Sequence, residues 1–188
     1  MEAIRQYFEQ TVTISEKDWL FFASKLIEQE FSKNQLLLAA GQTENYLSFV
    51  ESGIVRYYIE KEEQERTFAF AFKQSFVSAY NSFLTRTPSV YNVQALTKTK
   101  LWRIKYSDLQ SIYRETTIGN TIGRHASEAL LLKKSQRELS LLHETAEQRY
   151  LNLFTEQDQL LKEIPLKYIA SYIGITPQAL SRIRKRIS

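Results

Sequence analysis

The C-terminal part of the sequence gathers side chains that can read a nucleic acid. Gln178, Ser181, Arg182 and Lys185 recur at the three- and four-residue spacing of one helix face. Arginine can pair with guanine and glutamine with adenine in the DNA major groove, whereas other basic side chains reach the phosphates. The predicted DNA-binding residues are Lys167, Thr176, Gln178, Ser181, Arg182, Arg184 and Lys185. The chemistry indicated is recognition of double-stranded DNA.

Positive charge is concentrated in the same segment. Residues 162–188 hold six basic side chains and one acidic side chain, a balance of +5, whereas the whole chain carries +4. The other 161 residues therefore sum to −1. Such asymmetry is typical of a polyanion-binding module attached to a near-neutral body, although a solvated basic tail would give the same charge.

Two short helices are expected to position these side chains. Residues 166–173 predict a first helix, which Gly174 ends as a residue in the left-handed conformation. Thr176 is a good N-cap for a second helix, and Pro177 suits its first position because the missing N–H is not needed there. This order of helix, tight glycine turn and helix predicts a helix-turn-helix; the alternative is a helical hairpin with a solvated basic face.

A longer helix is expected over residues 117–143. A line of residues repeats along it at alternating three- and four-residue steps and is apolar except at His125, Gln136 and His143, which favours pairing with a second helix. The alternative is an amphipathic helix packed on its own domain. The predicted dimer interface consists of Ile118, Ile122, His125, Ala129, Leu132, Gln136 and Leu139.

The first 104 residues contain helices and then short strands. Residues 1–30 read as helical, with Ser15 as an N-cap before an apolar run that reaches Ile27. Strand-length apolar runs follow at 35–39, 46–51, 54–59, 66–72, 90–95 and 100–104. Many short strands at regular spacing predict a small barrel or jelly roll.

Composition narrows the class of protein. The sequence has no cysteine, which excludes disulfides, iron–sulfur clusters and thiol catalysis. It has no apolar run long enough to span a membrane and no signal peptide, so we expect a soluble cytoplasmic protein. No nucleophile elbow, P-loop or dinucleotide-binding glycine pattern is present, and we expect neither an enzyme nor a cofactor or metal.

Three blocks of the sequence resemble the Crp/Fnr family of cyclic-AMP receptor proteins. They are 164–186, the glycine-to-glycine segment 41–53, and 95–104. The resemblance implies an α+β chain: a cyclic-nucleotide-binding-like jelly roll over 1–116, a dimerisation helix and hinge over 117–145, and a C-terminal (winged) helix-turn-helix over 146–188. Because the sequence ends just past the second helix, any wing is expected to be absent or truncated.

The sequence departs from this family where a cyclic nucleotide would bind. Aligned by motif, Ser78 and Ala79 replace the Gly-Glu pair, and Ser89 and Val90 replace the Arg-Ser pair that holds the phosphate. A buried phosphate without a positive partner is unfavourable, so weak or no binding of cyclic AMP or cyclic GMP is expected. The residues expected to line the pocket instead are Phe70, Phe72, Ser78, Tyr80, Asn81, Ser82, Ser89 and Tyr91.

The sequence thus predicts a homodimeric, sequence-specific transcription regulator. The resemblance implies double-stranded DNA, RNA polymerase and a small-molecule effector other than cyclic AMP as partners, and no membrane. The aromatic pocket is consistent with an apolar effector or with a pocket filled by its own side chains. The alternative function is an effector-sensing or interaction protein of the same fold with vestigial DNA binding.

Overall fold

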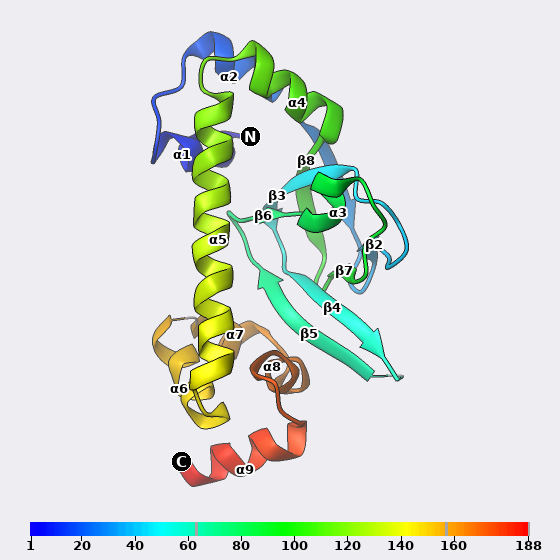
Figure 1. Cartoon of the computed structure of the whole chain (residues 1–188), viewed down its shortest axis with the longest axis vertical. Helices are drawn as coiled ribbons and strands as arrows, with labels where there is room; N and C mark the ends of the chain where they lie inside the picture. Colours follow the sequence, from blue (N-terminus) through cyan, green and yellow to red (C-terminus); the bar gives the residue numbers. More distant parts are fainter. Residues whose placement is uncertain (63, 157, 188) are drawn as a thin grey trace. The chain divides into compact units, whose positions relative to one another are not determined.

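The computed structural model describes residues 1–62, 64–156 and 158–187 (Figure 1). The described chain forms two compact units. The first consists of Met1–Tyr57 with Phe70–Glu128, and the second of Tyr58–Ala69 with Ala129–Ser188.

The first part of the chain mixes helices with strands, and the part after β8 is helical. In chain order they are α1 (Glu2–Glu9), α2 (Glu16–Ala23), β1 (Ile27–Phe31), β2 (Leu36–Leu38), β3 (Tyr46–Ser52), β4 (Val55–Lys61), β5 (Gln64–Ala71), β6 (Phe76–Val77), α3 (Tyr80–Thr85), β7 (Asn92–Ala95), β8 (Thr99–Lys105), α4 (Tyr106–Glu115), α5 (Gly119–His143), α6 (Ala146–Glu156), α7 (Asp158–Glu163), α8 (Leu166–Ile173) and α9 (Pro177–Ile187).

The strands form two four-stranded sheets in the order β1-β8-β3-β6 and β2-β7-β4-β5. The pairs β1–β8, β3–β8 and β2–β7 are antiparallel, and each joins strands distant in sequence. The crossed order of the strands is that of a jelly roll. The predicted α+β class with an N-terminal jelly roll is confirmed.

The prediction that residues 1–30 are helical is correct for the N-cap at Ser15 and wrong for the residues from Ile27 onward. Ser15 Oγ accepts a hydrogen bond from Asp18 N at 3.1 Å, as an N-cap should. However, α2 ends at Ala23, and Ile27 begins β1 opposite Arg103 of β8. Pairing with β8 provides the backbone partners of this segment, so tertiary structure overrides its helical periodicity.

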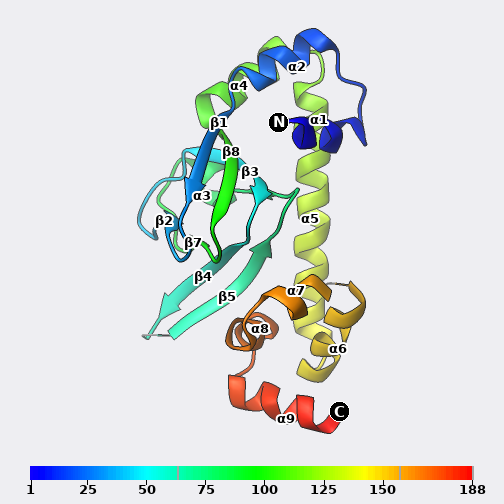
Figure 2. The same ribbon diagram turned by 180° about the vertical axis from the view of Figure 1, so that it is seen from behind.

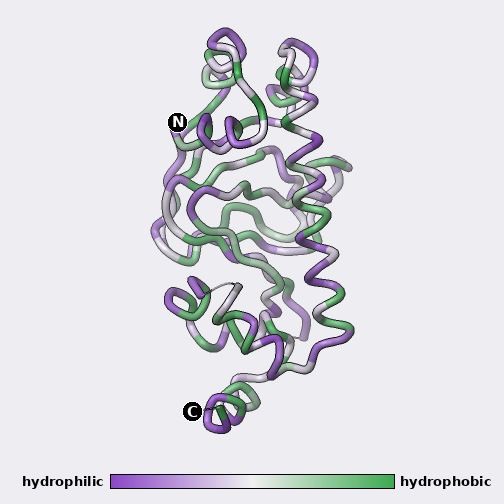
Figure 3. The backbone as a smooth tube through the Cα atoms, turned by 90° about the vertical axis from the view of Figure 1, so that its left-hand side faces the viewer, coloured by the Kyte–Doolittle hydropathy of each residue, from purple (hydrophilic) through white to green (hydrophobic). Residues whose placement is uncertain are grey.

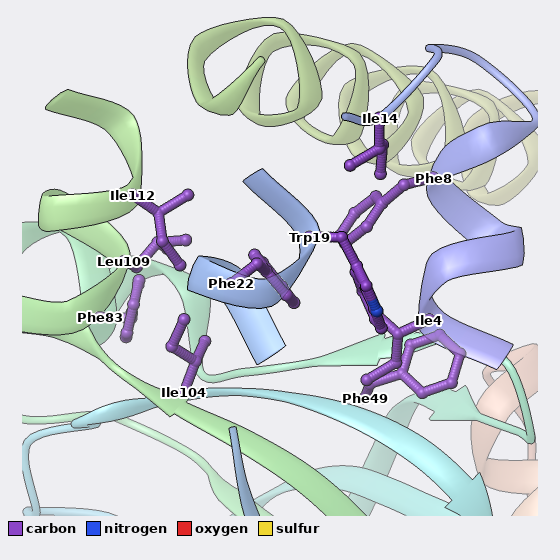
Figure 4. Packing of buried hydrophobic residues seen from close by; sticks show 10 residues of the cluster. All are labelled: Ile4, Phe8, Ile14, Trp19, Phe22, Phe49, Phe83, Ile104, Leu109 and Ile112. Carbon is purple, nitrogen blue, oxygen red and sulfur yellow. The ribbon is translucent and has the colours of Figure 1, made fainter. Parts of the chain in front are cut away.

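One apolar cluster joins the helices of the first unit to its sheet (Figure 4). The cluster brings together side chains from α1, α2, α3, α4, β3, β8 and the loop between α1 and α2: Ile4, Phe8, Ile14, Trp19, Phe22, Phe49, Phe83, Ile104, Leu109 and Ile112. Phe8 packs edge-on against Phe22 with ring centroids 5.3 Å apart. Burial of these large side chains packs the helices against β3 and β8.

The beginning of α5 is anchored by a buried acid. Asp18 Oδ2 accepts hydrogen bonds from Thr117 N at 3.3 Å and from Thr117 Oγ1 at 2.8 Å. Thr116 Oγ1 accepts from Gly119 N at 3.0 Å, and the helix runs from there to His143. Hydrophobic and hydrophilic residues are interspersed along α5 (Figure 3), and no helix in the described ranges is long and apolar enough to cross a membrane.

Candidate nucleic-acid interface

The turn between α8 and α9 has the geometry predicted for a helix-turn-helix (Figure 2). Gly174 lies in the left-handed region with φ of 84°, and Ile175 N donates to Ala170 O at 2.9 Å. Thr176 Oγ1 accepts from Ala179 N at 3.2 Å, and Pro177 is the first residue of α9. The predicted cap residues are therefore confirmed, because each acts through local backbone geometry.

The second helix has one buried and one exposed face. Leu180 and Ile183 are 1% and 8% exposed and pack with the buried residues of α8. The opposite face of α9 carries four exposed polar or basic side chains, Gln178, Ser181, Arg182 and Lys185. These side chains are donors and acceptors able to contact base edges and phosphates in a major groove.

The other predicted DNA-binding residues lie around this face. Thr176 is exposed at the start of α9, and Arg184 is exposed on its flank. Lys167 is exposed on α8, with its Nζ 4.7 Å from the centroid of the Tyr168 ring. Arg186, on the other flank, forms an ion pair with Glu147 of α6. The second unit thus holds all seven predicted residues at its surface.

The predicted dimer residues fall into two groups along α5. Ile118 and Ile122 are partly buried against the apolar cluster of the first unit. His125 Nδ1 lies 3.7 Å from Glu128 Oε2, and Ala129 and Gln136 are exposed. Leu132 and Leu139 are 64% and 53% exposed, respectively.

Further leucines enlarge the apolar surface of this half of α5. Leu131 and Leu142 are 68% and 78% exposed. At 100° per residue, Leu132, Leu139 and Leu142 fall on one side of the helix, and Leu131 lies beside them. So many exposed leucines are unusual for a helix that contacts only solvent.

Three serines of the predicted pocket donate to backbone carbonyls within the first unit. Ser78 Oγ donates to Tyr46 O at 3.0 Å, Ser82 Oγ donates to Thr87 O at 2.5 Å, and Ser89 Oγ donates to Tyr91 O at 2.7 Å. Asn81 is exposed on α3. These three hydroxyls therefore stabilise the backbone of the segment between β6 and β7.

The aromatic residues of the predicted pocket are buried to different extents. Phe70 is buried, whereas Phe72, Tyr80 and Tyr91 are half-buried. The ring of Tyr91 contacts the ring of Tyr57 with centroids 6.2 Å apart. Tyr57 is a buried residue of β4 that sequence reasoning did not single out.

A buried acid contacts the segment that replaces the family's Gly-Glu pair. Glu44 Oε1 accepts from Tyr46 N at 2.9 Å, and its Oε2 accepts from Ala79 N at 3.4 Å. Arg103 Nη2 is 3.8 Å from Glu44 Oε1, while the rest of this guanidinium donates to Ser48 Oγ and Gln29 Oε1. Burial is the main reason that the pKa of the Glu44 carboxyl is raised and that of Arg103 is lowered.

Arg86, the other cation near this segment, is also engaged. Its Nη1 donates to Glu44 O at 2.6 Å and its Nη2 donates to Asn45 Oδ1 at 2.5 Å. Its guanidinium carbon also lies 4.5 Å from the centroid of the Tyr106 ring. Arg86 therefore secures the loop before β3.

An open recess of about 450 Å³ lies beside Glu44 and Arg103. Its other lining residues come from β2, the loop before β3 and the first residue of β3: Leu37, Leu38, Gln42, Thr43, Asn45 and Tyr46. It shares no residue with the pocket predicted from the sequence. Glu44 and Arg103 were missed because they lie on separate segments, and nothing local in the sequence marks them as a pair.

The raised pKa of Glu44 predicts that part of the free energy of unfolding depends on pH. A carboxyl whose pKa is raised by folding stabilises the fold below its unfolded pKa, and this contribution is lost as pH rises through the folded pKa. An amide at this position does not titrate. Relative to the native chain, the free energy of unfolding of Glu44→Gln should therefore rise between about pH 4 and about pH 7. Urea denaturation at both pH values measures this difference, and a constant or falling difference would contradict it.

The sequence and the fold of the chain are similar to those of known proteins. Residues 28–116 match the family model of the cyclic nucleotide-binding domain. The c-di-GMP responsive global regulator CLP of Xanthomonas campestris is 16% identical with a TM-score of 0.70, over 92% of this chain and 91% of that one. A crp/fnr family protein from Eubacterium rectale is 17% identical with a TM-score of 0.73, over 97% of this chain and 87% of that one.

A mutant of CooA from Carboxydothermus hydrogenoformans is also similar, at 19% identity and a TM-score of 0.69 over 93% of this chain and 80% of that one. No curated protein sequence matches significantly. The resemblance predicted from the sequence is confirmed in the fold. The chain has the fold of these structures, which include a protein described as crp/fnr family, and its residues 28–116 are similar to the cyclic nucleotide-binding domain.

Proposed function

We propose that this protein is a homodimeric transcription regulator that binds specific sequences of double-stranded DNA through α9. The observation that carries the proposal is the exposed face of α9, where Gln178, Ser181, Arg182 and Lys185 stand opposite the buried Leu180 and Ile183. In a helix-turn-helix this is the face that enters the major groove. Arg182 and Gln178 would contact base edges, and Lys185 and Arg184 would contact phosphates.

The proposed dimer forms along α5. The exposed Leu132 and Leu139 support this, because pairing with a second copy removes their apolar surface from water. Two recognition helices brought together by a twofold axis would read half-sites about one DNA turn, or about 34 Å, apart. The domain divisions at 116 and 145 follow from the same proposal, with the hinge near residues 144–146.

The proposed effector is not a cyclic mononucleotide. No basic side chain stands at Ser89 and Val90, the carboxylate of Glu44 accepts from Ala79 N in the Gly-Glu slot, and Arg86 and Arg103 already donate to protein acceptors. A cyclic nucleotide bound in this segment would lie near a buried carboxylate, and an arginine could reach its phosphate only by giving up existing partners. RNA polymerase and a signal other than cyclic AMP remain part of the proposal by family analogy.

Calorimetric titration tests this exclusion. Cyclic AMP and cyclic GMP at micromolar concentration should give no stoichiometric binding to the full chain. A stoichiometric binding isotherm with either nucleotide would contradict the proposed chemistry of the pocket.

DNA binding is tested by anisotropy with a labelled duplex of random sequence at several salt concentrations. Because each neutralised phosphate releases counterions, the logarithm of the affinity should fall linearly as the logarithm of the salt concentration rises. Affinity that is absent or independent of salt would instead favour an interaction protein of the same fold.

A further inference from the structure

Two arginines from different helices meet the C-terminal end of α8. Arg137 of α5 donates from Nη2 to Tyr172 O. Arg149 of α6 donates from Nε to Ile173 O at 2.9 Å. These two carbonyls belong to the last two residues of α8 and directly precede the Gly174 turn. We call this pair, Arg137 and Arg149, the α8 clamp.

The two arginines of the clamp donate hydrogen bonds to carbonyl groups that have no donor within the helix. The last carbonyls of a helix lack intrahelical donors and carry partial negative charge, so cations are favourable there. The guanidinium of Arg137 also lies 4.1 Å from the centroid of the Tyr172 ring, where it adds a cation–π contact. Tyr172 is itself buried, so this guanidinium is held against a packed surface.

The clamp is tied to the segment between α5 and α6. Arg149 Nη1 donates to Glu144 O. The Glu144 carboxylate accepts from Ser140 Oγ of α5 at 2.5 Å and from Asn152 Nδ2 of α6 at 3.1 Å. The end of α5, the start of α6 and the end of α8 are therefore joined by hydrogen bonds around two guanidinium groups.

We propose that Arg137 and Arg149 are positioning residues that fix the direction of α9 relative to α5. The clamped carbonyls lie immediately before the turn, and α9 begins at Pro177, so their position sets where the recognition helix starts. Base contacts require α9 to lie in one orientation, whereas contacts with phosphates tolerate several. The clamp therefore supports specific binding more than non-specific binding. This proposal rests on the proposed function.

The test compares Arg137→Gln and Arg149→Gln with the native chain. Each variant should lose roughly tenfold or more in the ratio of specific to non-specific affinity, because a hydrogen bond to a charged group is removed. The salt dependence should stay unchanged, because neither arginine contacts phosphate. Arg137→Lys, which keeps the charge, should recover part of the ratio. Arg124→Gln is the matched control, since Arg124 is an exposed arginine on the same helix, paired with Glu128.

Two outcomes would overturn the proposal. A lower melting temperature with an unchanged affinity ratio would mean that the clamp only stabilises the fold. A weaker salt dependence in either glutamine variant would mean that the arginine contacts phosphate directly.

Amide hydrogen exchange measured without DNA tests the clamp independently of the proposed DNA-binding function. Amides at 174–176 and 178–180 should exchange faster in Arg137→Gln and Arg149→Gln than in Arg124→Gln. Faster exchange with no DNA binding by the native chain would contradict the proposed function alone. Unchanged exchange would contradict the clamp.

Discussion

Replacing Arg182 by alanine is expected to weaken specific DNA binding by roughly 1–3 kcal/mol and to relax base preference at one position of each half-site. Arg182 is exposed in the middle of the polar face of α9, one residue after Ser181 and four after Gln178. A guanidinium there can donate two parallel hydrogen bonds to a guanine, and alanine cannot replace either. Anisotropy titrations of the best duplex and its single-base variants measure both effects.

The control for this prediction is Arg114→Ala, which removes an exposed arginine from α4. Its affinity and base preference should equal those of the native chain. An Arg182→Ala variant that lost affinity equally on every sequence would show that Arg182 contacts the DNA backbone, and its assignment to a base edge would be wrong.

Placing glutamate at both Leu132 and Leu139 is expected to convert the proposed dimer to a monomer. In the single chain these side chains are 64% and 53% exposed, and in the proposed dimer they face their counterparts. Like charges brought together in an apolar interface repel, and self-association should weaken by at least roughly a hundredfold. Sedimentation at micromolar concentration measures the shift, and affinity for a palindromic duplex should fall with it.

Leu20→Glu provides the matched control for the dimer prediction. Leu20 is 60% exposed on α2, so this variant adds one charge at a comparably exposed leucine away from α5. It should remain dimeric. A double variant that stayed dimeric while the control did too would place the dimer interface elsewhere on the chain.

The parts of the structure that depend on local chemistry could be predicted from the sequence. Gly174, Thr176 and Pro177 act through their own backbone preferences and one or two neighbours, so the turn and the start of α9 could be located. Most strands were also found, because side chains alternate across a half-buried sheet. The exposed face of α9 then follows from helical geometry alone.

The parts that depend on distant partners could not be predicted. The change from helix to strand before Ile27 depends on pairing with β8, far along the chain. Glu44 and Arg103 come together only when the loop before β3 meets β8, and Arg137 reaches Tyr172 only when α8 packs near α5. A single sequence contains the residue types of these pairs but not the contacts.

Selection from a pool of randomised duplexes, with no small molecule added, tests the central claim most directly. A dimer that reads DNA through α9 should enrich a palindrome whose half-sites are about one helical turn apart. The selected duplex should bind much more tightly than a scrambled one at the same salt concentration. A pool that shows no enriched sequence, with equal affinity for selected and scrambled duplexes, would contradict sequence-specific recognition by this protein.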